Sequence, residues 1–421
     1  MALDRSAFFL SVVVQPEGEK GARLDVSDRI LGFTFVDSAK KADKLTLTLD
    51  NFDLAEFDNP TFRKGGLVTV TWGYAEIKHP PVTCRIQSVK GGLQLRVEAL
   101  ARSIDMNKVK RSRVFGSMKI SDIALQIAGE WGYSGDMLHV EDTSIMWGAV
   151  AQGGLTDAQF LAKHAKREGF QFYVDWSGFH FHQPNLGQRP RRVLEYFTSE
   201  TGDIKDDFDV ENDITARAGT VVVHGRNPMP RKDFAATADN ASTKRQGLAP
   251  NPEAEGETYV MDRSTGAVSV RQRVAGEHAV TAAPTEAAAK RHADAAFRGA
   301  QLGTVKMKMN IIGDPAMLAK SVVEVRGLGK RLSGNYYVSS VTHKGGGKSA
   351  YECELEMRRD GHSEKGTPTS KAKVNTQKAA TSGPQLTTSL NERDGQPTQT
   401  WRNTQGQAVG GPNDIPQSGG T

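Results

Sequence analysis

Two histidines, His180 and His182, have the residue type and spacing that could bind a metal ion. They stand two positions apart in a segment of strand-like alternation, so both side chains point to one face of the expected strand. Two imidazoles on one face can bind zinc. The sequence places no carboxylate or cysteine nearby to complete a site, and His164 could join only through tertiary folding. We therefore expect exposed or partly packed hairpin histidines, with no metal and no cofactor.

His164 and Glu168 are spaced i, i+4 in a segment of helical periodicity, where they could act as a general acid and base. Pairs of this spacing more often lie on a helix surface and contribute about 0.2–0.5 kcal/mol. We expect such a surface pair and no catalytic residue.

Charged runs suggest two further kinds of site. The first run is acidic and could bind calcium, but it lacks the EF-hand order and its glycine, which favours a solvated turn: Asp203, Asp206, Asp207, Asp209, Glu211 and Asp213. The second run is basic and could contact a phosphate backbone or an acidic patch on a neighbouring subunit: Lys108, Lys110, Arg111 and Arg113. Few aromatic residues interleave the basic run, which weighs against nucleic acid.

The composition is that of an ordinary soluble protein, with 38% hydrophobic and 24% charged residues. A net charge of +5 over 421 residues is only a weak basic bias. Cys84 and Cys353 lie in strand-like runs and are expected to be buried, reduced thiols. The glycine runs at 327–330 and 344–348 lack Walker spacing and a following helix, so we interpret them as turns. No apolar run is long enough to span a membrane. The N-terminal apolar run is interpreted as a strand and not as a signal peptide.

Residues 7–105 consist of short runs separated by Gly, Pro, Asp or Lys. Within these runs apolar and polar residues alternate with period two. Leu45, Leu47 and Leu49 alternate with threonines, for example. The pattern predicts an antiparallel barrel or sandwich of six strands, within 8–15, 28–37, 44–51, 66–74, 82–90 and 91–100.

Residues 106–200 predict two helices followed by a hairpin. The first helix places Ile120, Ala124, Ile127, Ala128 and Trp131 on one face, with Ser121 as N-cap and Ile120 and Leu125 as hydrophobic staple. The second begins with Thr156 and Gln159 at capping-box spacing and ends at Gly169. The hairpin turns at 176–178.

Strand patterns return after residue 200. A strand is expected within 219–226, then an insertion of about 226–283 with a hairpin around 269–274, then an Ala-rich helix capped by Thr285. Residues 302–358 predict a second barrel, which strands that precede the insertion could complete. We therefore predict four parts: a first β-barrel domain (1–105), an α+β domain (106–200), a second β-barrel domain with an insertion at 226–300 (201–360), and an extended arm (361–421).

The arm is rich in Gly, Pro, Ser, Thr, Asn and Gln and holds few large apolar residues. It cannot bury enough apolar area to offset an ordering entropy of roughly 1–2 kcal/mol per residue. We expect it to be disordered alone and to wrap other baseplate proteins when bound.

This order of parts resembles the phage late control protein D family, the baseplate hub of contractile tails, and the N-terminal module of type VI secretion spike proteins. Three segments carry the resemblance: FTFVDSAKKADKLTLTLDNFD, FLAKHAKREGFQFYVDWSGFHF and GDPAMLAKSVVEVRGLGKRLSGNYYVSSVTHK. The resemblance spans about 1–360, while the insertion at 226–283 and the arm lie outside it.

The resemblance implies a mainly β structural protein with two tail-tube-like barrels in each chain. It implies a homotrimer with pseudo-sixfold symmetry, which joins a hexameric tail tube to a trimeric spike and lines a channel through which DNA passes as transient cargo. It also implies a place in the virion tail, after synthesis in the host cytoplasm, with no membrane insertion. Polar strand faces such as Thr46, Thr48, Gln94 and Arg96 would suit a channel wall.

Two other classes stay open. The first is a tail-associated peptidoglycan-degrading enzyme, although the insertion and the arm are short and poorly patterned for a catalytic domain. The second is a basic nucleic-acid-binding packaging protein, suggested by a pI near 9.0.

Overall fold

The computed structural model describes most of the chain. The described residues are 7–16, 23–58, 61–196, 203–212, 220–226, 233–239, 247–249, 251–252, 257–261, 268–272, 276–280, 285–346, 349–363, 385–390, 397–402 and 408–409.

The first part of the chain forms the six strands that alternation predicted, which we call the N-terminal module. Its strands are β1 (Phe9–Gln15), β3 (Ile30–Ser38), β4 (Lys44–Asp50), β5 (Leu67–Gly73), β6 (Val82–Gly91) and β7 (Gln94–Ala101). Three short elements accompany them: β2 (Leu24–Asp25), the 3-10 helix η1 (Ser27–Arg29) and α1 (Ala55–Asp58). Leu45, Leu47 and Leu49 are fully buried while the threonines between them are not, because side chains alternate across a strand.

A second set of six strands, the C-terminal module, is assembled from both sides of the insertion. Its strands are β15 (Val193–Glu195), β16 (Ile204–Asn212), β23 (Val305–Ile312), β24 (Val322–Arg326), β25 (Gly334–Gly346) and β26 (Ser349–Arg359). The one-turn helix α5 (Gly329–Leu332) separates β24 from β25. A short helix therefore does follow the glycine run at 327–330, whereas the sequence predicted none.

The two modules repeat one topology. The N-terminal module is ordered β3-β4-β7-β6-β5-β1, and the C-terminal module is ordered β16-β23-β26-β25-β24-β15, which is the same succession in chain order. Corresponding pairs are antiparallel except at the last position, where β1 pairs with β5 antiparallel and β15 pairs with β24 parallel.

Register shifts at equivalent places in the two modules support the conclusion that they are repeats of one unit. The β6–β7 ladder shifts register between Ile86 and Ser88, and the corresponding β25–β26 ladder shifts between Val338 and Ser340. Bulges are specific local features that bend a strand, so their presence at equivalent places indicates two copies of one structural unit.

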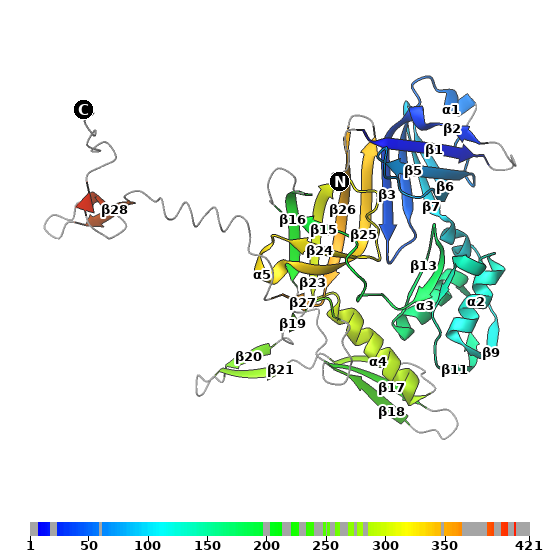
Figure 1. Cartoon of the computed structure of the whole chain (residues 1–421). Coiled ribbons are helices and arrows are strands. Elements are labelled where there is room, and N and C mark those ends of the chain that lie inside the picture. The colour runs from blue at the N-terminus through cyan, green and yellow to red at the C-terminus, as the bar shows by residue number, and fades with distance from the viewer. Residues whose placement is uncertain are drawn as a thin grey trace.

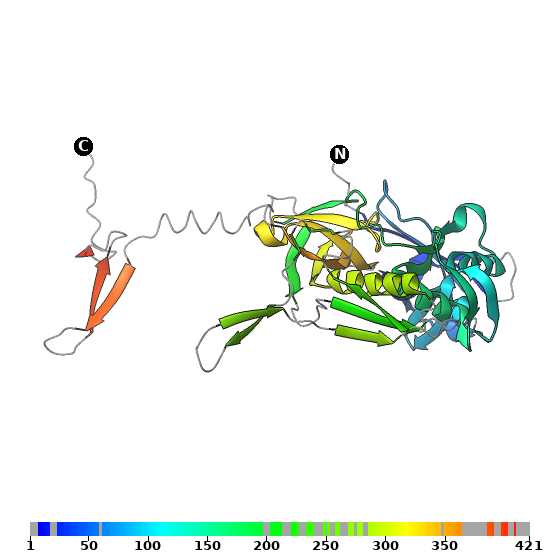
Figure 2. The ribbon, with the colours of Figure 1, turned by 90° about the horizontal axis from the view of Figure 1, so that it is seen from below.

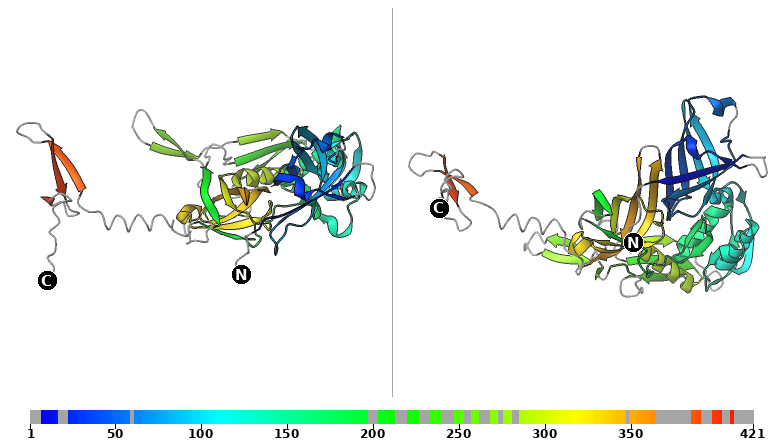
Figure 3. Two further views of the ribbon diagram at one scale, coloured as in Figure 1. Left: turned by 90° about the horizontal axis from the view of Figure 1, so that it is seen from above. Right: turned by 45° about the horizontal axis from the view of Figure 1, so that its top comes forward.

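The modules join side by side because β25 continues past β24 and pairs its second half with β3. The result is one continuous sheet with a shared hydrophobic core (Figure 1). The right view of Figure 3 shows the same adjacency of the blue and the yellow-to-orange strands. Mainly antiparallel β structure is thus confirmed, but the described strands form an open path from β16 to β2 and close no barrel.

The helices and short strands after β7 form a separate core, which we call the central domain. Its helices are α2 (Ile120–Glu130) and α3 (Asp157–Glu168), with the 3-10 helices η2 (Arg102–Asn107) and η3 (Gly135–Met137). Its strands are β8 (Lys110–Arg111), β9 (Val114–Lys119), β10 (Leu138–Val140), β11 (Met146–Ala151), β12 (Leu155–Thr156), β13 (Gln171–Asp175) and β14 (Gly178–His182). Both helices and the β13–β14 hairpin were predicted.

The two helix starts differ in how well the sequence located them. Thr156 and Gln159 form the expected capping box, and Gly169 ends α3 in the left-handed conformation at φ 73°. The N-cap of α2 is Lys119, not Ser121, because the Ser121 side chain turns inward and bonds Thr143 and Asp142 instead. Leu125 is exposed and forms no staple.

The insertion contributes to the central core. Strand β17 (Thr220–Arg226) pairs with β18 (Asp233–Ala238) and β22 (Gly276–Val280), and α4 (Glu286–Gln301) packs against β17 and β18 (Figure 2). Thr285 caps α4 as predicted. The expected hairpin is β20 (Glu257–Met261) with β21 (Val268–Gln272), and β19 (Asn251–Pro252) pairs with β27 (Gly361–His362). The four predicted domain limits stay predictions.

Of the predicted arm, the described residues comprise 361–363 and three strands. These are β28 (Gln385–Leu390), β29 (Pro397–Arg402) and β30 (Ala408–Val409), which pair with one another. The rest of the arm lies outside the described residues, so its expected disorder stays a prediction.

Candidate functional site

The outward face of the continuous sheet carries alternating charges and hydroxyls. One cross-strand row runs across the boundary between the two modules, through Glu352, Lys344, Thr34, Thr46, Glu98 and Ser88. None of these side chains is buried, whereas the residues on both sides of each of the first five are buried. Thr46 and Arg96, predicted for a polar face, both lie on it.

Ion pairs between adjacent strands neutralise charges on this face of the sheet. Lys44 Nζ lies 3.0 Å from Glu98 Oε1 in the N-terminal module, and Lys344 Nζ lies 2.6 Å from Glu354 Oε2 in the C-terminal module. Lys308 approaches Glu356 at 3.5 Å. Such exposed pairs contribute only about 0–1 kcal/mol each to stability, so their main effect is a surface with no strong field of one sign.

The acidic run at 203–213 is not a solvated turn. Most of it is the edge strand β16, which pairs with β23 on one side and, among the described strands, with none on the other. Phe208 and Val210 pack against the core, while Asp209 and Glu211 are exposed. The side chains of Asp206, Asp207 and Asp213 lie outside the described residues.

A second unpaired edge lies on β6. The first half of this strand pairs with β5, and Ile86 bonds Gly65 and Gly66. The second half, Ser88–Gly91, pairs with β7, and in the described part of the chain no strand covers its other side. In the C-terminal module the equivalent half of β25 is the stretch that pairs with β3.

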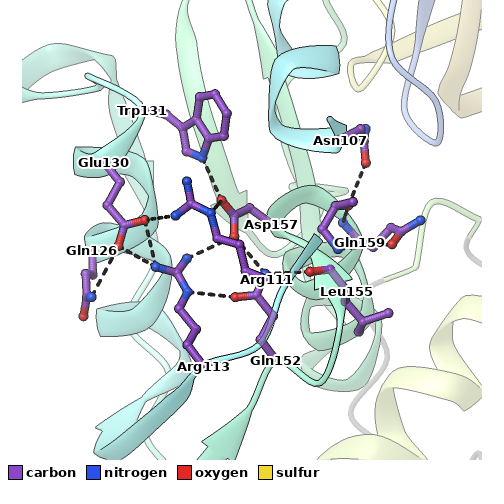
Figure 4. Close-up of polar contacts among 11 residues, drawn as sticks. Asn107, Arg111, Arg113, Gln126, Glu130, Trp131, Gln152, Leu155, Asp157 and Gln159 are labelled. Carbon is purple, nitrogen blue, oxygen red and sulfur yellow. Dashed lines mark hydrogen bonds and ion pairs between the residues drawn. The ribbon is translucent and has the colours of Figure 1, made fainter. Parts of the chain in front are cut away.

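The two arginines of the basic run at 108–113 contact carboxylates of their own chain, whereas Lys108 and Lys110 are exposed. Arg113 donates to Glu130 at 2.7 Å and to Asp157 at 3.0 Å, and Arg111 donates to Glu130 at 2.6 Å. Figure 4 shows both guanidinium groups between these two carboxylates. Lys108 pairs with Asp105 at 2.6 Å. The arginines therefore neutralise carboxylates of their own chain instead of forming a free cationic patch.

Asp157 is the buried centre of this cluster, at 1% exposure. Besides Arg113 it accepts hydrogen bonds from Trp131 Nε1 at 2.9 Å and Gln152 Nε2 at 2.8 Å. The contacts tie α2, α3 and the loop after β11 together, which is a structural role.

His180 is buried, contrary to the expectation of an exposed or partly packed side chain. Its ring stacks between His139 and Tyr173, with centroids 4.3 and 4.4 Å away. Burial lowers the pKa of His180, against the opposing effect of Asp175. A carboxylate therefore does stand beside it, and this neighbour was missed although Asp175 is only five positions away.

Ser177, His180 and Asp175 contain the residue types of a nucleophilic triad but not its connectivity. Ser177 Oγ and Asp175 Oδ1 both approach the same nitrogen of His180, Nε2, at 2.9 and 3.2 Å. A triad uses one ring nitrogen for the nucleophile and the other for the carboxylate. Ser177 Oγ also donates to Asp175 at 2.7 Å, so these contacts shape the hairpin turn.

His182 is partly packed, as expected, whereas the prediction for His164 changes. His182 Nδ1 lies 2.7 Å from the Gln183 carbonyl, and His164 packs on Phe160 with its pKa lowered by burial to about 4. His164 and Glu168 are buried, not a surface pair, because α4 covers them and Arg291 Nη1 bonds Glu168 at 2.9 Å. The described residues contain no cluster of metal-ligating side chains large enough for a metal ion. Cys84 and Cys353 are buried and free, as expected.

A buried ion pair that the sequence did not suggest joins three parts of the fold. Lys320, in the loop before β24, places Nζ 2.6 Å from Asp37 Oδ1 on β3 and 4.4 Å from the ring centroid of Tyr173 on β13. Burial alone would lower the pKa of Lys320, but Asp37 and Asp43 outweigh it and raise that pKa. Lys320 has a positive φ of 64°, which is unusual for a residue other than glycine.

Comparisons with solved structures identify the fold. A tail protein from Neisseria meningitidis MC58 has a TM-score of 0.57 at 13% identity, covering 85% of this chain and 99% of that one. The prophage MuSo2 43 kDa tail protein from Shewanella oneidensis has a TM-score of 0.57 at 12% identity, covering 84% and 99%. An E. coli component of the type VI secretion system, described as structurally similar to T4 bacteriophage tail proteins gp27 and gp5, has a TM-score of 0.50 at 9% identity, covering 83% and 76%.

These likenesses support the predicted resemblance at the level of the fold, whereas membership of the late control protein D family stays a prediction. None of the curated proteins compared with the chain matches it significantly. The described helices include none with the length and apolar character needed to cross a bilayer. The family model named Alg8 N-terminal domain matches residues 58–345, more than half of the sequence, and the chain therefore belongs to the Alg8 N-terminal domain family.

Proposed function

We propose that this chain is a structural hub of the baseplate in a contractile phage tail or phage-like injection system. Three copies form a ring that joins a hexameric tail tube to a trimeric spike and surrounds a channel. The observation that carries the proposal is the internal repeat: each chain holds two modules of one topology, so three chains present six similar modules.

The connection between the modules within one chain suggests how neighbouring chains connect. Inside the chain, the second half of β25 pairs with β3, with Thr342 opposite Val36. The repeat makes β6 the counterpart of β25 and β16 the counterpart of β3. Strands β6 and β16 both have an unpaired edge among the described residues, and unpaired edges readily accept another strand.

The ladders also define the register of this contact. Ser88 follows the bulge of β6 as Ser340 follows the bulge of β25, so Lys90 corresponds to Thr342. Glu211 corresponds to Val36, because Glu211 pairs with Lys306 as Val36 pairs with Lys44. Lys90 of one chain then lies opposite Glu211 of the next. Opposite charges at directly facing positions of a sheet are favourable by about 0.2–1 kcal/mol.

The charge-balanced sheet face suits the channel wall. A channel that DNA crosses quickly needs a wetted surface without a strong positive field, because each lysine or arginine bound to a phosphate adds affinity through counterion release. The ion-paired lysines and glutamates of this face meet that requirement.

Contacts with other baseplate proteins are proposed for two further regions. One end of the N-terminal module exposes large apolar side chains: Phe52, Leu54, Phe57 and Leu93. Phe52 is 78% exposed, and an exposed apolar group of this kind suits a protein contact. The arm at 361–421 is proposed to bind further baseplate proteins.

The role is proposed to be structural and not catalytic. The shared use of one His180 nitrogen by Ser177 and Asp175 supports this for the most enzyme-like cluster among the described residues. A zymogram on bacterial cell walls tests it: clearance that is lost on changing one acidic residue would establish the enzyme instead. The nucleic-acid alternative predicts a strongly salt-dependent DNA mobility shift.

The assembly test is the mass of the purified chain in solution, with and without residues 361–421. We expect a species of three 45.7 kDa chains. Lys90→Glu and Glu211→Lys each weaken the trimer, and the double exchange restores it, since the facing charges are opposite again. Lys330→Glu, on α5, is the control and leaves the trimer intact. A trimer unaffected by either single exchange would contradict the β6–β16 contact.

A further inference from the structure

A polar cavity of about 180 Å³ lies where the two modules and the central domain meet. The N-terminal module contributes Asp37, Asp43 and His79, the β13–β14 hairpin contributes Asp175 and Trp176, and the loop before β24 contributes Lys320. One water molecule requires only ~10–15 Å³ of this kind of space, so the cavity can hold a small organic ligand.

Several charged side chains at the cavity already have partners within the chain. Asp37 is satisfied, because Lys320 Nζ reaches Oδ1 at 2.6 Å and the Ala319 amide donates to Oδ2 at 2.8 Å. Lys320 is itself occupied by that contact and by Tyr173. The other cation at the wall, Arg191, is exposed and donates from Nε to the Ala316 carbonyl at 2.8 Å.

Two carboxylates keep one oxygen uncommitted. Asp43 is 6% exposed, and Ser38 donates its amide to Oδ1 at 3.1 Å. Burial and the neighbouring carboxylate of Asp37 raise the pKa of Asp43 well above its ordinary value, so the chain by itself favours the neutral form and a bound cation favours the charged form. On Asp175 the contacts of Ser177 and His180 all go to Oδ1. In the described part of the chain, no donor reaches Oδ2 of either residue. Both residues line the cavity, so a ligand with N–H groups can donate to these oxygens.

His79 supplies a third acceptor. It is 2% exposed, and its Nδ1 lies 2.7 Å from the Pro80 carbonyl, an oxygen that can only accept. Nδ1 therefore carries the proton, and Nε2 presents a lone pair. Burial lowers the pKa of His79, which keeps this tautomer neutral. The His79 ring stacks on Trp72 at 4.0 Å and meets Trp176 edge-on at 6.4 Å, so its position is fixed.

We infer that this cavity binds a small organic cation with several N–H donors, of the primary ammonium or guanidinium class. Asp175 supplies negative charge, and Asp43 supplies more once the cation displaces its proton. His79 accepts a hydrogen bond, and the half-exposed indole of Trp176 supplies an aromatic surface for the cation. Because the lining comes from all three parts of the fold, the bound cation would hold the central domain against both modules.

Titration calorimetry on the full chain tests the inference with methylammonium and guanidinium chloride at low, non-denaturing concentration. Tetramethylammonium and sodium at equal ionic strength are the comparison probes, since they are cations without N–H donors. We expect one saturable site per chain for at least one of the first two probes. Affinity for the comparison probes should be at least tenfold weaker. Equal binding of tetramethylammonium, or no saturable binding of either N–H probe, would overturn the inference.

Variants locate the site. Asp43→Asn keeps an acceptor for the Ser38 amide but cannot ionise when the cation binds, and should weaken binding at least tenfold. Trp176→Ala changes a half-exposed side chain and should weaken it severalfold. The control is Asp142→Asn, whose carboxylate is 66% exposed and paired with Lys119, and it should bind as the wild type does. Unchanged affinity in both Asp43→Asn and Trp176→Ala would place any bound cation elsewhere. If Asp43→Asn does not fold, the comparison of probes on the wild-type chain still decides.

Discussion

The indole N–H of Trp72 donates to the hydroxyl of Tyr351 at 3.1 Å, although the two residues are 279 positions apart. Trp72 lies on β5 and Tyr351 on β26, so the bond crosses the boundary between the two modules. His343 extends the contact, with Nδ1 2.8 Å from the Tyr351 hydroxyl and 3.2 Å from Cys353 Sγ. A buried polar network therefore lies inside the shared core, where each member depends on the others for its hydrogen bonds.

The network predicts acid sensitivity. Burial, with a smaller contribution from His79, lowers the pKa of His343 from 6.5 to about 3. Between these values the unfolded chain binds a proton that the folded chain excludes, so the free energy of unfolding falls as pH falls. His343→Asn cannot take up this proton. We expect its stability to change less between pH 6.5 and 4, by up to about 1.4 kcal/mol per pH unit, in urea denaturation. Identical pH slopes for the two chains would contradict the assignment.

The Lys320–Asp37 pair predicts a large loss on removal of one partner. Lys320→Met leaves Asp37 buried without its cation, and should lower the free energy of unfolding by about 3–5 kcal/mol. Adding Asp37→Asn removes the uncompensated charge and should recover part of the loss. Lys306→Met breaks an exposed pair with Glu211 and should cost at most about 1 kcal/mol. Chemical denaturation of the four chains measures this, and equal effects of the two lysine changes would argue against a buried connection.

The cluster around Asp157 predicts that the central domain needs this buried carboxylate for its stability. Asp157→Ala leaves the buried donors of Arg113, Trp131 and Gln152 without their acceptor and should destabilise the chain by about 3 kcal/mol or more. Asp142→Ala removes a carboxylate from the same domain, but an exposed one, and should cost less than about 1 kcal/mol. Thermal unfolding followed by circular dichroism compares the two. A small effect at Asp157 would mean that water replaces its contacts.

Two glycine substitutions should change stability in opposite directions. Gly169 has φ 73°, and a Cβ there would lie 3.1 Å from Ala295 Cβ, so Gly169→Ala should cost about 1–2 kcal/mol. Gly129 lies in α2 with open space around it, and Gly129→Ala should add about 0.5–1 kcal/mol. The midpoint of urea denaturation reports both. A gain at Gly169 would contradict the left-handed end of α3.

Local structure followed from local pattern. Alternation located all six strands of the N-terminal module, and the capping box at Thr156 and Gln159 located the start of α3. These features depend on neighbours a few residues away, which the sequence displays directly. Mainly β architecture and the resemblance to tail proteins at the level of the fold followed from the order of such elements.

Only the tertiary structure decided which polar side chains are buried and which partners they bind. The sequence predicted Glu168 on a surface, yet Glu168 is buried and bonded to Arg291 of α4. For Arg111 and Arg113 the sequence left open a phosphate backbone or an acidic patch on a neighbouring subunit, and the structure pairs both with Glu130 and Asp157 of their own chain. The Lys320–Asp37 pair joins residues 283 positions apart and has no local signature. A side chain's burial and charge partner depend on which segments pack against it, and that packing is set by the whole chain at once. The resemblance implied two similar modules in each chain, but for the same reason their matching strand order is a property of the tertiary structure.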